Sequence, residues 1–111
     1  MGEPENPDLL PGTLYMMILQ TLSHGPRHGY AIAQHIRDWS KGDLHVEDGS
    51  LYPALNRMLG KGWVKAAWGV TDNGRRARFY RLTPAGRKQL ETESTAFHKM
   101  IRAIQLVMRT S

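Results

Sequence analysis

Cysteine is absent from this chain of 111 residues. Its absence excludes disulfide bonds, thiolate metal ligands and cysteine nucleophiles, and nothing in the sequence indicates an oxidising compartment. A long apolar run is also lacking, because the longest stretch, residues 14–22, is far shorter than the ~20 residues of a membrane span. The first ten residues are acidic and interrupted by proline, unlike the basic and then apolar start of a secretory signal. We therefore expect a cytoplasmic protein that does not enter a membrane.

The sequence also lacks the patterns that are typical of enzymes and metal sites. Residues 69–74 contain glycine but not the Lys-Ser/Thr ending of a phosphate-binding loop, and no Ser-His-acid order or paired carboxylate stands out. His24 and His28 are separated by Gly25-Pro26, so they cannot share a helix face as metal ligands. The other three histidines stand alone: His35, His45 and His98. We expect no catalytic residue, no metal and no cofactor.

What the chain does have is ordinary globular composition with an uneven positive charge. Hydrophobic residues make up 41% and charged residues 23%, which favours one folded domain whose modest core would gain stability from self-association. Fifteen Lys and Arg against ten Asp and Glu give a net charge of +5. Residues 57–90 hold nine of the basic residues against one acid, Asp72. This balance suits a polyanion, so nucleic acid is the first partner to consider.

Apolar spacing predicts four helices. The first covers residues 11–23 and is stopped by Gly25-Pro26, and the second starts near residue 28 with Tyr30, Ile32, Ala33 and Ile36 facing inward. The third follows Asp48-Gly49-Ser50, whose side-chain oxygens suit a helix start, and ends at Gly60 or Gly62. The fourth begins after Thr83-Pro84, an N-cap followed by a first-turn proline, and runs toward Met108.

Strand signals are fewer. Residues 44–46 alternate over a length that allows only a strand stub, whereas residues 63–68 and 79–82 predict a hairpin with a long tip at 69–77. The expected fold is therefore mainly α with a small β-hairpin. Three helices followed by a hairpin form a winged helix-turn-helix, in which the third helix enters the DNA major groove and the hairpin loop touches the backbone.

The predicted domain organisation has three parts. We expect residues 1–8 to be disordered, residues 9–83 to form the winged helix-turn-helix domain, and residues 84–111 to form a C-terminal dimerisation helix. At 1.5 Å per residue the last helix spans ~35 Å, about the diameter of the domain, so it should overhang and pack on a second chain. Its apolar residues are spaced alternately four and three apart around one polar member, Ser94, as in a coiled-coil seam. The apolar members of this seam are Leu90, Phe97, Ile101, Ile104 and Met108.

The candidate DNA-binding residues lie on the third helix and the hairpin. Asn and Arg side chains can make bidentate contacts to base edges, and arginines at a wing tip can bind phosphate or enter a minor groove. The candidates are Ser50, Tyr52, Pro53, Asn56, Arg57, Lys61, Arg75, Arg76 and Arg78. Plainer interpretations remain open: Tyr52 could be half-buried, Asn56 an ordinary surface residue, and the basic loop a solvated loop or a surface for an acidic protein. The three tryptophans are expected to pack in the core or on the domain surface instead of forming a ligand cage: Trp39, Trp63 and Trp68.

Four stretches of the chain resemble the PadR-like transcriptional regulators. They are PGTLYMMILQTL, GPRHGYAIAQHI, DGSLYPALNRMLGKGWV and RRARFYRLTPAGRKQL, which together cover nearly all of the chain after residue 9. The resemblance implies a dimeric winged-helix repressor of double-stranded DNA with a single C-terminal helix. It also implies that this helix and the first helix, through Leu14, Met17 and Ile18, build the dimer.

The resemblance further implies an effector site at the dimer interface, occupied in some members by phenolic acids or flat aromatic drugs. Phe97, Met100 and Ile101 would line it in this chain. Many members carry Trp about where this chain has Phe97, so a seam residue that packs against its mate is the alternative role for Phe97.

Overall fold

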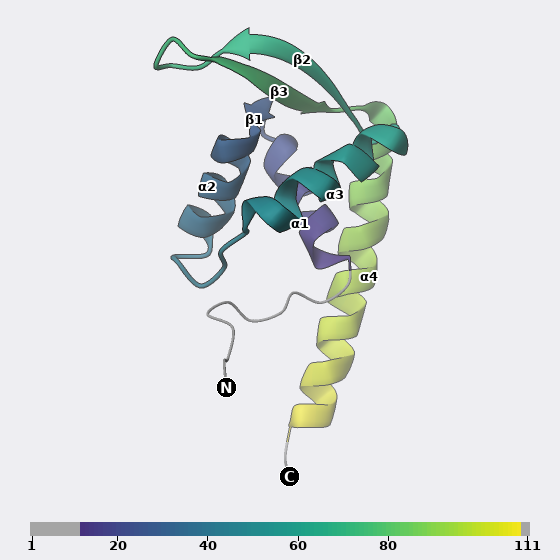
Figure 1. The fold of residues 1–111 in the computed structure, drawn as a ribbon. Coiled ribbons are helices and arrows are strands. Elements are labelled where there is room, and N and C mark those ends of the chain that lie inside the picture. Colours follow the sequence, from purple (N-terminus) through teal and green to yellow (C-terminus); the bar gives the residue numbers. More distant parts are fainter. Residues whose placement is uncertain (1–11, 110–111) are drawn as a thin grey trace.

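The computed structural model describes residues 12–109 and has the expected winged helix-turn-helix fold (Figure 1). In chain order its elements are α1 (Thr13–Leu22), β1 (Arg27–His28), α2 (Gly29–Trp39), α3 (Asp48–Gly60), β2 (Val64–Val70), β3 (Arg76–Leu82) and α4 (Pro84–Met108). All four predicted helices are present, with ends within a few residues of those expected. The disorder predicted for residues 1–8 lies outside the described residues, as do Thr110 and Ser111.

Local side-chain chemistry accounts for several helix ends. The His28 Nδ1 atom accepts a hydrogen bond from the Ala31 N–H (3.3 Å) and so caps the start of α2. The chain leaves α3 through Gly62, which has φ +76°, a conformation that glycine adopts without strain. The Thr83 hydroxyl accepts from the Gly86 N–H (3.0 Å) and donates to the Gly62 carbonyl oxygen (2.6 Å), which ties the start of α4 to the start of β2.

The sheet has three antiparallel strands in the order β1-β3-β2, and this corrects two predictions. The extra strand is Arg27–His28, which pairs with Tyr80 and Phe79. Residues 44–46 form no strand: the Leu44 N–H donates to the Ser40 hydroxyl (2.9 Å), and Val46 enters the core from a loop.

The hairpin tip is shorter than predicted. Pairing between β2 and β3 extends to Val70 opposite Arg76, which leaves only residues 71–75 in the turn. The Thr71 N–H donates to the Arg75 carbonyl oxygen (2.8 Å), and Gly74 takes a positive φ of +82°. Arg76 and Ala77 therefore belong to β3 and not to the tip, and Arg78 follows them on the same strand.

The core lies where α1, α2 and α3 meet the base of the hairpin. Its buried members are Ile18, Leu19, Leu22, Ile32, Ile36, Val46, Leu51, Ala54, Leu55, Met58, Val64 and Tyr80. The prediction that Tyr30 faces inward is wrong, because its side chain is 70% exposed on the first turn of α2.

Helix α4 packs its first half against α1 and leaves its second half without cover in the described chain. Leu90 lies against the core, and Phe97 and Ile101 are partly buried. Beyond them Ile104 is 42% and Met108 71% exposed. Figure 1 shows this second half extending past the rest of the domain, on the side opposite the hairpin.

Candidate nucleic-acid interface

Helix α3 turns a row of small and polar residues outward. Leu51, Ala54, Leu55 and Met58 are buried, so one side of the helix is fixed against the core. At about 100° per residue the opposite side consists of Gly49, Pro53, Asn56 and Gly60, all exposed. With so little side-chain bulk, this face can come close to the floor of a groove, and Asn56 is its one amide.

Tyr52 lies beside that row, on the side of α3 that is nearer to the sheet. Although 41% of the residue is exposed, its hydroxyl end lies over the backbone of Gly29, where an added Cβ would clash with it. Burial raises the pKa of the Tyr52 hydroxyl above its usual value, and the nearby Asp48 carboxylate and Tyr80 add to the rise. Tyr52 is therefore a neutral hydroxyl held between α2, α3 and β3.

Ser50, Arg57 and Lys61 lie on the other flank of α3, and aromatic rings of the same chain hold the two cations. The Arg57 Nε–H donates to the Tyr15 hydroxyl, and the guanidinium carbon lies 5.7 Å from the centre of that ring. The Lys61 Nζ lies 5.3 Å from the centre of the Trp63 ring. Both cations stay exposed beside the outward row, where they suit backbone phosphates better than base edges.

The wing carries the other predicted arginines. Arg75 is at the tip, and Arg76 and Arg78 alternate on β3 with Ala77 between them. The guanidinium of Arg78 lies over the Tyr80 ring at 5.9 Å, and that of Arg76 lies over the Trp68 ring at 4.9 Å. Tyr80 lies close enough to Tyr52 to affect its pKa and also carries the Arg78 guanidinium, so it links the Tyr52 flank of α3 to the arginines of the wing.

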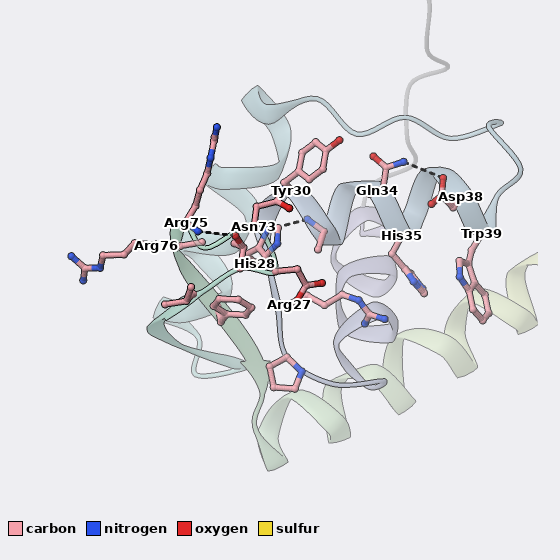
Figure 2. Close-up of a pocket in the computed structure, with 17 residues that line it drawn as sticks. Arg27, His28, Tyr30, Gln34, His35, Asp38, Trp39, Asn73, Arg75 and Arg76 are labelled. Atoms are coloured by element: carbon pink, nitrogen blue, oxygen red, sulfur yellow. Dashed lines mark hydrogen bonds between the residues drawn. The ribbon is translucent and has the colours of Figure 1, made fainter.

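A broad open groove of about 960 Å³ separates α2 from the wing (Figure 2). Phe79 forms part of its wall, while Figure 2 shows the Arg75 and Arg76 side chains pointing out of it. Arg27 is tied to the Thr21 carbonyl oxygen (3.0 Å), and Gln34 donates to Asp38 (3.1 Å). Figure 2 shows the Arg27, Arg75 and Arg76 side chains pointing in different directions.

Three exposed aromatic residues near these elements were not among the sequence candidates. Tyr30 stacks on His28, Trp39 stacks on His35 (4.8 Å between ring centres), and Trp68 holds Arg76. Trp39 is 73% and Trp68 64% exposed, so of the two predicted roles, core or domain-surface packing, these two lie at the surface, whereas Trp63 is partly buried. From strand alternation alone, Trp68 is expected on the same face of the sheet as buried Val64. The sequence does not show that the hairpin extends beyond the core, so that Trp68 on this face is exposed.

The predicted dimer residues divide into covered and exposed ones. Ile18 is fully buried in the core of its own chain, so its side chain has no surface to offer a second copy. Leu14, Met17, Leu90, Phe97 and Ile101 are partly buried, and Ile104 and Met108 are exposed, as is Met100 of the predicted effector site. Residues 100–108 therefore form the largest uncovered part of the predicted seam.

Residues 12–109 contain neither a cluster of metal-ligating side chains nor a membrane-spanning helix. No group of three or more histidine, aspartate and glutamate side chains lies close enough to hold a metal ion. Within the same residues, no helix combines the length and the apolar character that crossing a bilayer requires.

Known proteins share both the sequence and the fold. The family model for PadR-like transcriptional regulators matches residues 18–92. A transcriptional regulator of Mycobacterium tuberculosis is 33% identical over 87 residues, which is 78% of each chain. A protein of Lysinibacillus sphaericus is 26% identical over 101 residues, 91% of this chain and 93% of the relative.

Solved structures agree with these matches. A transcriptional regulator from Clostridium thermocellum superposes with a TM-score of 0.80 at 26% identity, covering 88% of this chain and 95% of the other. A PadR family transcription regulator from Clostridium difficile gives a TM-score of 0.76 at 25% identity, covering 88% of this chain and all of the other.

Proposed function

Because the chain belongs to the PadR-like family of transcriptional regulators, whose function is DNA-binding regulation, we propose that it is a repressor that binds an inverted-repeat operator as a homodimer. In this proposal residues 9–83 contact DNA and residues 84–111 hold two copies together. Each half-site receives one α3 in the major groove and one wing beside it.

One observation carries the proposal: the outward row of α3 is flanked by cations on both sides. Asn56 stands in a row of small residues, with Arg57 and Lys61 on one flank. On the other flank Tyr52 lies near Tyr80, which carries the Arg78 guanidinium on its ring. Arg76 shares the face of β3 with Arg78. In this arrangement the Asn56 amide can contact a base edge while the cations on either side of it bind the DNA phosphates. Sequence-specific binding needs both kinds of contact.

Dimer formation is supported by the free end of α4. Three apolar side chains on the seam side of its end are exposed in the single chain: Ile104, Val107 and Met108. A second copy that covers this surface would place two α3 helices in one assembly. Two-fold symmetry then predicts half-sites about one helical turn, or ~34 Å, apart.

Selection from a pool of random duplexes tests the function directly. We expect an enriched inverted repeat, and binding to it should weaken linearly in log salt as Lys and Arg displace counterions from phosphate. Enriched duplexes without inverted symmetry would contradict the two-fold dimer. If no sequence is enriched over random duplexes, the operator-binding proposal fails and an acidic protein becomes the partner to test on the basic wing.

Relief of repression by a small aromatic effector is the final part of the proposal. Phe97, Met100 and Ile101 lie on consecutive turns of α4, between the half that packs on α1 and the free end, and supply apolar surface for a flat ring. Titration of the operator complex with planar aromatic acids and drugs, followed by fluorescence anisotropy, tests this. We expect a compound to release the duplex from the unaltered chain but not from Phe97→Ala. If none of the compounds releases the duplex, this part of the proposal is contradicted.

A further inference from the structure

The face of the wing that continues the core surface carries an exposed aromatic residue with an arginine laid on it. Side chains alternate along a strand, so Trp68 shares its face of β2 with Ala66 and with buried Val64. Across the ladder Trp68 is opposite Arg78, and Arg76 is the diagonal neighbour. Trp68, Arg76 and Arg78 therefore lie on the α3 side of the sheet, beyond the point where the core ends.

The Trp68 indole has no large packing role that would explain its presence. It is 64% exposed, and the core residues do not include it. Its recorded ring contact is with the Arg76 guanidinium, whose central carbon lies 4.9 Å from the ring centre. The neighbouring Arg78 has a comparable partner in Tyr80, but Tyr80 is a buried member of the core.

We propose that Trp68 is a positioning residue for DNA binding, which acts by holding the Arg76 guanidinium on the α3 side of the wing. This deepens the proposed function and rests on it. A guanidinium that lies on an aromatic face still has its N–H donors along its edges, where they can reach phosphate oxygens or a minor-groove floor. An unsupported arginine loses rotamer freedom when it contacts DNA, whereas one already held on a ring loses less.

A double-mutant cycle separates this role from direct DNA contact. The duplex is the one enriched by selection, and the proteins are the unaltered chain, Trp68→Ala, Arg76→Ala and the double variant. An exposed cation–π contact predicts that Trp68→Ala weakens binding about two- to fivefold per wing. Because Trp68 acts through Arg76, removing the indole in the Arg76→Ala background should cause no further loss.

Salt dependence adds a readout that a purely structural role would not change in this way. Arg76→Ala should lower the slope of log affinity against log salt by ~1 per wing, whereas Trp68→Ala keeps every charge and should leave the slope unchanged. Trp68→Phe keeps an aromatic face and should recover part of the affinity. Trp39→Ala is the matched control, because Trp39 is equally exposed but lies at the end of α2, away from the arginine face.

A measurement without DNA tests the contact itself. Ring currents shift the NMR signal of an N–H group held on an indole, so the Arg76 Nε–H signal should move toward its ordinary position in Trp68→Ala and stay in place in Trp39→Ala. An unmoved signal would overturn the inference whatever the DNA results are.

The outcomes distinguish the inference from the function beneath it. If the unaltered chain binds duplex and Trp68→Ala binds equally well, the inference alone is wrong. Equal losses from Trp68→Ala in both backgrounds would make Trp68 a direct DNA contact and also overturn it. If the unaltered chain binds no duplex, the proposed function fails and the inference fails with it.

Discussion

At the scale of single residues, the position of α4 depends on a glycine. A Cβ added at Gly86 would collide with the Trp63 carbonyl oxygen and come within 2.9 Å of Leu82 Cδ1. Backbone cannot give way as a flexible side chain can, so we expect Gly86→Ala to destabilise the protein by ~1–3 kcal/mol or more. Gly60→Ala is the control: Gly60 is also helical, and apart from its chain neighbours and the nearby backbone of α3 no atom of the described chain lies within 4 Å of an added Cβ. Alanine there should stabilise α3 by ~0.5–1 kcal/mol. Urea unfolding measures both, and equal effects would contradict the close approach.

A second residue-scale prediction concerns pH. Burial lowers the pKa of His35 from 6.5, and nearby Arg27 and His24 lower it further, while Asp38 acts in the opposite direction. The folded state therefore binds this proton less readily than the unfolded state. Stability from this site is present above pH 6.5 and is lost as pH falls from 6.5 toward the lower folded-state pKa.

His35→Gln should make unfolding less sensitive to pH in that window. Denaturant titrations between pH 5 and pH 8 measure the effect, with exposed His45→Gln as the control. A pH dependence as steep in His35→Gln as in the unaltered chain would contradict the assignment.

The amide of Asn56 gives the third residue-scale prediction. If it reads a base, Asn56→Ala should cost ~1–3 kcal/mol at one position of each half-site and relax selectivity there, while the salt slope stays unchanged. Gln34→Ala removes an amide of similar chemistry that is bound to Asp38 on α2, so its DNA affinity should not change. Affinities for duplexes substituted at single positions decide the matter, and a uniform loss on all of them would give Asn56 a positioning role instead.

At the scale of elements, the sequence predicted what depends on local chemistry. Thr83-Pro84 sets the start of α4, and the apolar spacing of α1 and α3 identifies their buried faces. The strand β1 could not be found in this way, because two residues carry no alternation. Arg27 and His28 become a strand only when β3 lies beside them, which is a tertiary event.

The same limit explains why part of the site was missed. From sequence alone Arg75 and Arg76 belonged to a long loop at 69–77, since the Asn-Gly pair suggested where the chain turns but not how far pairing extends. Pairing up to Val70 opposite Arg76 turns that loop into a stiff ribbon and fixes which way Trp68 faces. Asn56 and Tyr52 were identified from residue type. That Asn56 faces outward while Tyr52 lies toward the sheet depends on which side of α3 packs on the core, and the sequence alone does not show this.

The wing as an element should contribute electrostatics more than sequence preference. We expect Arg75→Ala with Arg76→Ala to weaken binding to all duplexes and to lower the salt slope by ~2 per wing, one for each lost phosphate contact. Lys41→Ala with Arg37→Ala removes equal charge from the end of α2 and serves as the control. An effect confined to one duplex sequence would mean that the wing reads bases.

At the scale of the whole molecule, the basic cluster and the uncovered end of α4 lie on different parts. The basic cluster covers α3 and the wing. Apart from Val70 on the wing, the exposed large aliphatic and methionine side chains of the described chain lie on the far half of α4, which Figure 1 shows projecting away from the hairpin. Sequence periodicity treated residues 90–108 as one seam. The fold uses the first half of that seam against α1, because α1 offers partly buried Leu14 and Met17 in the same chain.

The free half of the seam gives the last prediction. Ile104 is 42% exposed in a single chain, so Ile104→Asp leaves the new carboxylate in contact with water and should not unfold the monomer. In a dimer joined through this face the same carboxylate would be buried without a partner, at a cost of several kcal/mol, and the dimer should dissociate. Leu106→Asp adds the same charge two residues further on, about 200° around the helix, and should leave the dimer intact. Sedimentation velocity measures the assembly, and operator affinity should fall only in Ile104→Asp, because two linked half-site contacts become separate weak ones. Dimers that persist in Ile104→Asp and bind operator normally would show that the two copies meet through another surface.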